Sequence, residues 1–147
     1  MKKGKIIMTT VAIIVLAGLG YFKGMGIYSS SKVMDIGVKE GKLKVCIEKP
    51  NCVSTTNTNK EHKTSVIVTN FTLEEIIEKL IENDLELIKS DGNYAHFTHT
   101  STLMSYVDDI EIMLNDNELS IRSASRVGYS DMGKNRERVE LIRDILK

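Results

Sequence analysis

The sequence predicts an α+β domain behind an N-terminal transmembrane helix, and three observations support this prediction. An uncharged apolar run from Ile6 to Phe22 follows a cluster of lysines, two later segments carry apolar residues at helical spacing, and two β-hairpin patterns lie between those segments. Burying the apolar stripes requires a small, mainly antiparallel sheet of four or five strands with both helices packed on one face.

The N-terminal run determines the expected location of the protein. From Ile6 to Phe22 it spans about 25 Å as a helix, which is the lower edge of a bilayer core. Lys2, Lys3 and Lys5 favour a cytoplasmic N-terminus, so we expect a single-pass cell-membrane protein with an extracytoplasmic C-terminal domain. A cleaved signal peptide, whose apolar region is usually shorter, is the alternative, and a buried core helix is a third interpretation.

We expect an anchor (or signal peptide) at residues 1–24, a glycine- and serine-rich juxtamembrane tether at 25–34, and a single domain at 35–147. The whole chain has 20 basic and 20 acidic residues, and residues 1–24 hold four lysines and no acid. The remainder therefore carries 16 basic against 20 acidic residues, a net charge of about −4. An acidic domain is a poor electrostatic match for nucleic acid, so no nucleic-acid partner is expected.

The first regular elements of the domain are a strand and a helix. Residues 64–69 are rich in β-branched side chains and predict a strand. Thr72 and Glu75 then have the spacing of a helix capping box, and Phe71 is placed to pack on Ile76 as a hydrophobic staple.

Two hairpins follow this helix. The first joins residues 85–90 and 94–100 across Asp91-Gly92, a two-residue turn signal. The second joins residues 106–114 and 119–125. The alternation of apolar residues favours the register that pairs Leu114 with Leu119, because the apolar side chains of both strands then share one face.

The C-terminal segment predicts the second amphipathic helix, at residues 133–147. Val139 and Ile142 belong to its apolar stripe, and Ser130 or Asp131 is the expected N-terminal cap.

The two cysteines predict a disulfide. Cys46 and Cys52 are separated by five residues in a domain expected to face an oxidising space. Two buried free thiols are one alternative, and a metal or redox site is another. Because His96 and His99 point to opposite faces of a strand, and His62 lies in a polar loop where we expect it to be solvated, no metal or cofactor is predicted.

The acidic pair Asp108-Asp109 has two possible roles. Asp108 shares the apolar face of the second hairpin and is expected to point inward, opposite Ser125. Asp109 points the other way, beside Arg122 and Arg126. A network of ion pairs that braces the sheet, a polar ligand site and general acid–base catalysis are the alternatives.

The run from Arg122 to Arg138, here called the arginine corner, combines small hydroxyls, guanidinium groups, glycines and a helix N-terminus, which together can hold an anion. A tight strand-to-helix corner is the alternative. The candidate ligand-binding residues are Asp108, Asp109, Arg122, Ser123, Ser125, Arg126, Asn135 and Arg136.

Two long motifs stand out together. The first runs through Gly41-Lys42-Leu43, Cys46 and Pro50-Asn51-Cys52-Val53-Ser54, and the second is Asp108-Asp109 followed by the arginine corner. Together they resemble the family called domain of unknown function 1499. The resemblance covers the chain from about Asp35 onward and implies one domain. Members of that family occur in bacteria and plastid-bearing eukaryotes, often behind a signal or membrane segment, and no activity can be carried over.

The function expected from these features is non-enzymatic: a membrane-tethered domain that binds a protein partner or a small anionic ligand at the arginine corner. The alternative is an enzyme that uses Asp108 or Asp109 with Arg122 or Arg126 on a small anionic substrate. A cleft that joins the acids, the arginines and the cysteine loop favours a ligand site, whereas filled, mutually paired side chains favour a brace.

Overall fold

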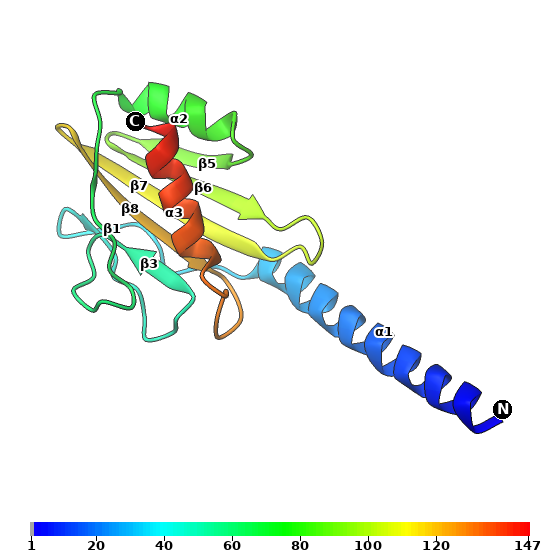
Figure 1. Cartoon of the computed structure of the whole chain (residues 1–147). Coiled ribbons are helices and arrows are strands. Elements are labelled where there is room, and N and C mark those ends of the chain that lie inside the picture. Colours follow the sequence, from blue (N-terminus) through cyan, green and yellow to red (C-terminus); the bar gives the residue numbers. More distant parts are fainter. Residues whose placement is uncertain (1) are drawn as a thin grey trace.

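The protein consists of a long N-terminal helix that leads into a sheet carrying two further helices (Figure 1). The computed structural model describes residues 2–147, with side chains from Gly4 onward. The helices are α1 (Lys2–Ser31), α2 (Leu73–Ile81) and α3 (Lys134–Ile145). The strands are β1 (Val38–Lys39), β2 (Lys42–Leu43), β3 (Cys52–Ser54), β4 (Ile67–Val68), β5 (Glu86–Asp91), β6 (Tyr94–Thr100), β7 (Val107–Asn115) and β8 (Glu118–Ser125).

The main sheet has the strand order β3-β8-β7-β6-β5, and β4 pairs with the other half of β8. All of these pairings are antiparallel, so the predicted α+β architecture is confirmed. The sheet has six strands where four or five were predicted, because the cysteine segment contributes β3. Residues 52–54 are buried and pair with residues 122–124.

The second hairpin has the predicted register, with Leu114 opposite Leu119. In the first hairpin Asp91 pairs with Tyr94, so the two-residue turn is Gly92-Asn93, one residue later than predicted. Gly92 has a φ of 60°, a conformation that glycine adopts without strain.

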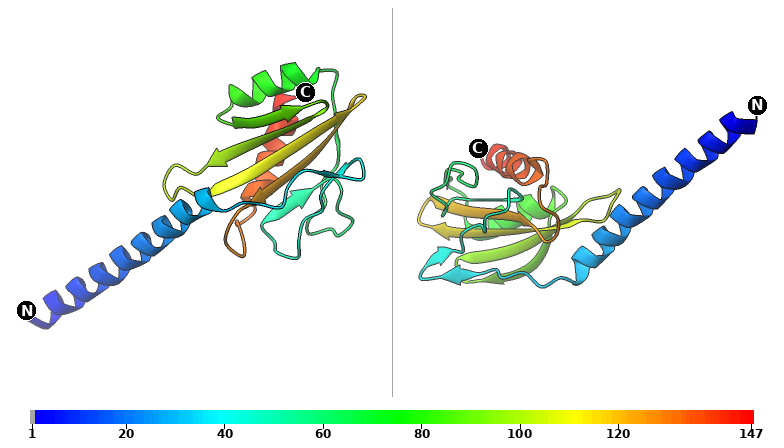
Figure 2. Two further views of the ribbon diagram at one scale, coloured as in Figure 1. Left: turned by 180° about the vertical axis from the view of Figure 1, so that it is seen from behind. Right: turned by 90° about the horizontal axis from the view of Figure 1, so that it is seen from below.

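One face of the sheet carries the apolar core beneath α2 and α3, as predicted (Figures 1 and 2). Fully buried side chains from the sheet and from both helices form a single cluster there: Ile76, Leu80, Phe97, Ile110, Ile112, Leu119, Ile121, Val139 and Ile142. The period-two alternation of β7 and β8 and the helical stripes of α2 and α3 therefore meet in one core.

The two core helices begin differently. At α2 the capping box between Thr72 and Glu75 is present as predicted. At α3 the prediction of Ser130 or Asp131 as the N-cap is wrong, because the N-cap residue is Gly133, with a φ of 84°. The Asp131 carboxylate nevertheless accepts hydrogen bonds from the N–H groups of Gly133 and Asn135, so it supplies the acceptors that a capping side chain would.

Residues 32–45 cover the opposite face of the sheet, and we call this segment the strap. It contains the β1–β2 hairpin, and Figure 2 shows it on the side of the sheet away from α3. Leu43 of the strap is fully buried, and the Gly37 N–H donates to the Glu111 carboxylate at 2.5 Å. Because the strap covers this face, β7 is buried on both sides, from Val107 to Met113.

The helix α1 carries the apolar run with its large side chains exposed. It is the one helix of the described chain that is long and apolar enough to cross a membrane, by length and composition. The helix continues to Ser31, so residues 25–31, which were predicted as a tether, are instead its last two turns.

Candidate functional site

The strand β7 places the predicted site residues on opposite faces of the sheet. Asp108 points to the helix side, as predicted, and forms an ion pair with Arg138 of α3 at 2.9 Å. Asp109 points to the strap side, where it contacts Arg126 and His96. The candidate residues therefore form two clusters separated by the sheet.

On the helix side, Asn135 joins the end of β8 to the start of α3. Its Nδ2 donates to the Asn51 carbonyl and to Ser125 Oγ, both at 2.9 Å, and its Oδ1 accepts from Ser123 Oγ at 2.6 Å. The side chain is buried, and both of its amide atoms are hydrogen-bonded within the protein. Ser123, Ser125 and Asn135 thus brace the corner between strand and helix.

The guanidinium group of Arg138 links Asp108 to His99. Its Nη2 atom lies 3.0 Å from His99 Nδ1 and 2.9 Å from the Asp108 carboxylate. Burial lowers the pKa of His99, and the positive charge of Arg138 lowers it further. His99 therefore accepts the Arg138 hydrogen bond as a neutral ring.

We expect the free energy of unfolding to fall as the pH drops below about 6.5, the ordinary histidine pKa. In that range unfolded His99 takes up a proton that folded His99 resists, because its folded pKa is lowered, so acid favours unfolding. Urea titrations of the wild type and of His99→Asn between pH 5 and pH 8 measure this effect. The variant should show the shallower dependence, and identical slopes would contradict the assigned contact.

On the strap side, Asp109 is fully buried and accepts three hydrogen bonds. Arg126 donates through Nε at 2.9 Å and Nη2 at 2.8 Å, and His96 Nε2 lies 2.8 Å from Oδ1. Burial by itself raises the pKa of Asp109, but the hydrogen bonds from His96 and Arg126 outweigh it and lower the pKa below the ordinary value. His96 and His99 lie on opposite faces, as predicted.

The carboxylate of Glu111, which was not among the predicted site residues, is the central acceptor of the strap side. Its Oε2 pairs with Arg122 Nη1 at 2.7 Å, and its Oε1 accepts from the Tyr94 hydroxyl at 2.9 Å and from Gly37 N. In the predicted register Glu111 lies opposite Arg122. This pairing of opposite charges could have identified Glu111 as a site residue from the sequence. Burial, followed by the adjacent Glu111 charge, raises the pKa of Tyr94, so this hydroxyl stays a donor.

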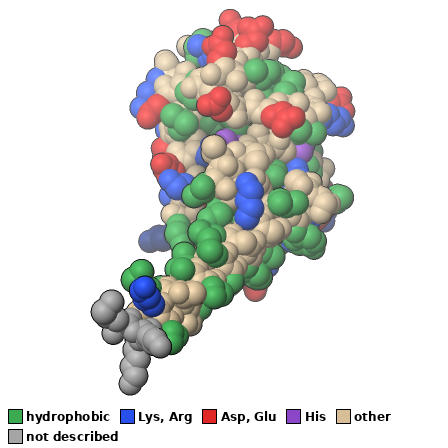
Figure 3. Space-filling view, turned by 90° about the vertical axis from the view of Figure 1, so that its right-hand side faces the viewer, with side chains coloured by type: hydrophobic (Ala, Val, Ile, Leu, Met, Phe, Trp, Pro, Cys, Tyr) green, Lys and Arg blue, Asp and Glu red, His purple; other side chains and the backbone are tan. Residues whose placement is uncertain are grey.

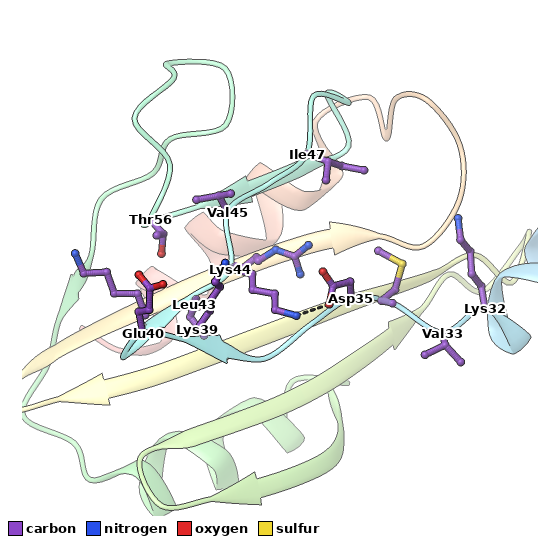
Figure 4. Close-up of a pocket in the computed structure, with 13 residues that line it drawn as sticks. Lys32, Val33, Asp35, Lys39, Glu40, Leu43, Lys44, Val45, Ile47 and Thr56 are labelled. Carbon is purple, nitrogen blue, oxygen red and sulfur yellow. Dashed lines mark hydrogen bonds and ion pairs between the residues drawn. The ribbon is translucent and has the colours of Figure 1, made fainter.

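Arg122 is the residue that connects this buried network to a cavity. It is only 3% exposed, and its Nε atom is buried with no hydrogen-bond partner among the described residues. The side chain lines a cavity of about 800 Å³ between the strap and the segment that carries Cys46, which we call the strap pocket (Figure 4). A buried guanidinium N–H without an acceptor is costly, and a ligand acceptor would satisfy it.

The walls of the strap pocket are of two kinds. Five basic residues and two acidic residues line it, a local excess of positive charge in an otherwise acidic domain: Lys32, Lys39, Lys42, Lys44 and Arg122 against Asp35 and Glu40. Figure 4 shows the exposed side chains of Val45 and Ile47 on one side and the Lys44–Asp35 ion pair on the other. The pocket thus offers cationic groups beside an apolar wall.

A smaller cavity of about 40 Å³ adjoins the strap pocket and shares Arg122 with it. Arg126 and Cys52 also line this smaller cavity. Both arginines therefore lie next to the loop between Cys46 and Cys52. The predicted disulfide between Cys46 and Cys52 is present, with Cα atoms 5.7 Å apart, and it packs on Ala124. Neither Asp108 nor Asp109 lines either of these two cavities.

The loop between β3 and β4 differs from its prediction at one residue. His62 was predicted to be solvated, but it is 3% exposed, and its Nδ1 lies 3.0 Å from the Cys52 carbonyl.

Arg136, a candidate ligand-binding residue, donates to the carbonyls of Lys63 and Glu61 in the loop between β3 and β4. It therefore fastens this loop to α3, which lies on the helix side of the sheet.

Residues 42–146 match the family model described as "Protein of unknown function (DUF1499)". The match covers more than half of the chain and includes the cysteine loop, β7 and the arginine corner. No curated protein and no solved structure matches the chain.

Proposed function

The chain belongs to the DUF1499 family, whose function is unknown, and we propose that it is a membrane-anchored binding protein that takes an anionic amphiphile into the strap pocket. By anionic amphiphile we mean a carboxylate or phosphate group attached to an apolar body. The observation that carries the proposal is the buried, unpartnered Nε of Arg122, a residue whose side chain lines this pocket.

The chemistry of the pocket supports both halves of this ligand class. Arg122 offers its N–H groups in a fixed position, because Glu111 holds Nη1, and a guanidinium suits carboxylate and phosphate oxygens. Lys39 and Lys42 are exposed at the rim and form no ion pair among the residues described. Val45 and Ile47 would cover the apolar body, and the volume is within the usual range for small-molecule sites.

The alternative function, an enzyme based on the acidic pair, has less support. Asp108 and Asp109 lie on opposite faces, and each already forms an ion pair with an arginine. Two carboxylates that act together on one substrate would have to face it from the same side of the sheet.

The location we propose is the outer side of the membrane, with α1 as an uncleaved anchor. The lysine-rich start of α1 favours a cytoplasmic N-terminus, and the Cys46–Cys52 disulfide suits an oxidising space. A C-terminal reporter that is active only in the cytoplasm should therefore be silent, while one active only outside should give a signal. The reverse pattern would refute this orientation.

Calorimetry on the full chain in phosphatidylcholine nanodiscs tests the ligand class. Hexyl phosphate should bind more tightly than inorganic phosphate, which lacks the apolar body, and hexanol, which lacks the charge, should give no more heat than empty discs. Discs that contain phosphatidylglycerol test the source of the ligand, because a bilayer lipid that enters the pocket should compete with hexyl phosphate.

A pair of variants separates the strap pocket from general surface charge. Lys39→Ala with Lys42→Ala should weaken hexyl phosphate binding at least tenfold, about 1.4 kcal/mol. Lys60→Ala with Lys89→Ala removes the same charge from exposed positions outside the pocket and should leave binding unchanged. Equal affinities in both double variants, or no binding by the wild type, would refute the proposed function.

A further inference from the structure

The helix α1 is longer than a bilayer core requires. A hydrocarbon core about 30 Å thick takes about 20 helical residues, whereas α1 has 30. With the uncharged run in the core, Lys23 lies at its outer boundary, and residues 24–31 project about 12 Å beyond it. This projecting part is where α1 meets the domain.

The loop that connects β6 to β7, residues 101–106, lies against the projecting turns. Lys23 Nζ donates to the Leu103 carbonyl at 3.2 Å and to Ser105 Oγ at 2.6 Å. A β-carbon at Gly26 would lie 1.6 Å from the Met104 carbonyl oxygen, so this close approach of helix and loop requires glycine.

Two further contacts fix the end of α1 to the sheet. Ser29 is fully buried, and its Oγ accepts from the Val107 N–H, at the start of β7, at 2.9 Å. Arg126, the residue directly after β8, donates to the Ser30 carbonyl at 3.1 Å and to the Asp109 carboxylate. The anchor is therefore joined to the domain through side-chain contacts as well as through the chain itself.

With α1 placed in this way, the apolar tip of the 101–106 loop would lie at the level of the lipid. Leu103 is 77% exposed, and its own carbonyl is bound to Lys23, the residue at the hydrocarbon boundary. A single exposed leucine is ordinary on a protein surface, but one at this depth faces lipid head groups and acyl chains. Ile27 and Tyr28 are exposed on the same turns of α1, and tyrosine is typical of the membrane interface.

We propose that the 101–106 loop is a second membrane contact, in which Leu103 enters the bilayer interface beside α1. The domain is then held in one orientation, with the Lys32 and Val33 end of the strap pocket close to the head groups. The acidic side chains gather at the opposite end of the domain, over α2 (Figure 3), which keeps them away from anionic lipid. The inference rests on the proposed crossing of the membrane by α1.

Fluorescence quenching by nitroxide-labelled lipids tests this contact on the full chain in vesicles of phosphatidylcholine and phosphatidylglycerol. An environment-sensitive dye is attached at Leu103→Cys, or at Glu78→Cys on the exposed face of α2, while the native cysteines remain bridged. Lipid nitroxides should quench the dye at position 103 at least twice as strongly as the dye at position 78. Equal quenching in a protein that stays with the vesicles after a carbonate wash would overturn the inference and leave the anchor intact.

A second comparison tests whether docking of α1 places the loop. Gly26→Leu should reduce quenching at position 103 to the level at position 78, because the side chain cannot fit against Met104. Gly24→Leu is the matched control, since a β-carbon there meets no atom of the described chain within 4 Å, and it should leave the quenching unchanged. Quenching that survives Gly26→Leu would overturn the docking geometry, and release of the protein by the carbonate wash would refute both the anchor and the second contact.

Discussion

Replacing Glu111 with alanine is expected to lower the free energy of unfolding by about 3–5 kcal/mol, because the substitution leaves Arg122 charged and buried without its carboxylate. Glu111 is fully buried and Arg122 is 3% exposed, so both charged groups are largely removed from water. The strap also loses the hydrogen bond from Gly37 to Glu111. Urea denaturation of the full chain in detergent at neutral pH measures the change.

Two further variants serve as controls for the effect of Glu111→Ala on stability. Glu118→Ala removes an exposed acid from β8 and should change stability by less than about 0.5 kcal/mol. The double variant Glu111→Ala with Arg122→Ala should lose less than the sum of the two single variants, because the two side chains form one ion pair. An unchanged midpoint for Glu111→Ala would show that this pair is not buried as described.

The second large effect is expected from Asp109→Asn, which keeps the shape of the side chain and removes its charge. Arg126 and His96 then lose a charged acceptor in a buried place, at a cost of roughly 3 kcal/mol. Equal stability of the wild type and Asp109→Asn would contradict the structural role of this carboxylate.

The same substitution should change the response to acid. Because the pKa of folded Asp109 is lowered, its charge stabilises the fold above about pH 4, the ordinary value, and this contribution is lost as the pH falls through the lowered folded pKa. Acid unfolding of the wild type should therefore be steeper than that of Asp109→Asn below about pH 4. Parallel acid-unfolding curves would contradict the assignment.

The sequence predicts the faces of β7 and β8 well because alternation has a period of two. Pairing Leu114 with Leu119 is enough to place Asp108 and Asp109 on opposite sides of the sheet. It also places Glu111 opposite Arg122, yet Glu111 did not stand out as a site residue. Alternation on a strand with one solvated face predicts that such a glutamate is exposed, and only the strap makes it a buried acceptor.

The strap pocket itself could not be predicted because its parts come together through long-range contacts. Residues 32–45 have no periodicity that indicates a partner, and they cover the sheet through contacts such as Gly37 with Glu111. The end of α1 is a similar case: its glycines and serines are typical of a tether, but Gly26 and Ser29 are used to dock the helix on the domain. Local composition says nothing about such docking.

The Nε–Hε signal of Arg122 in the ¹⁵N–¹H spectrum of the full chain in phosphatidylcholine nanodiscs tests the central claim most directly. The claim is that this N–H, buried and without an acceptor, receives the anionic group of the ligand. Titration with hexyl phosphate should shift this signal saturably, with the affinity found by calorimetry, and the Lys39→Ala, Lys42→Ala variant should need at least tenfold more ligand. An Arg122 signal that stays in place while hexyl phosphate binds would contradict the claim and put the anion elsewhere on the protein.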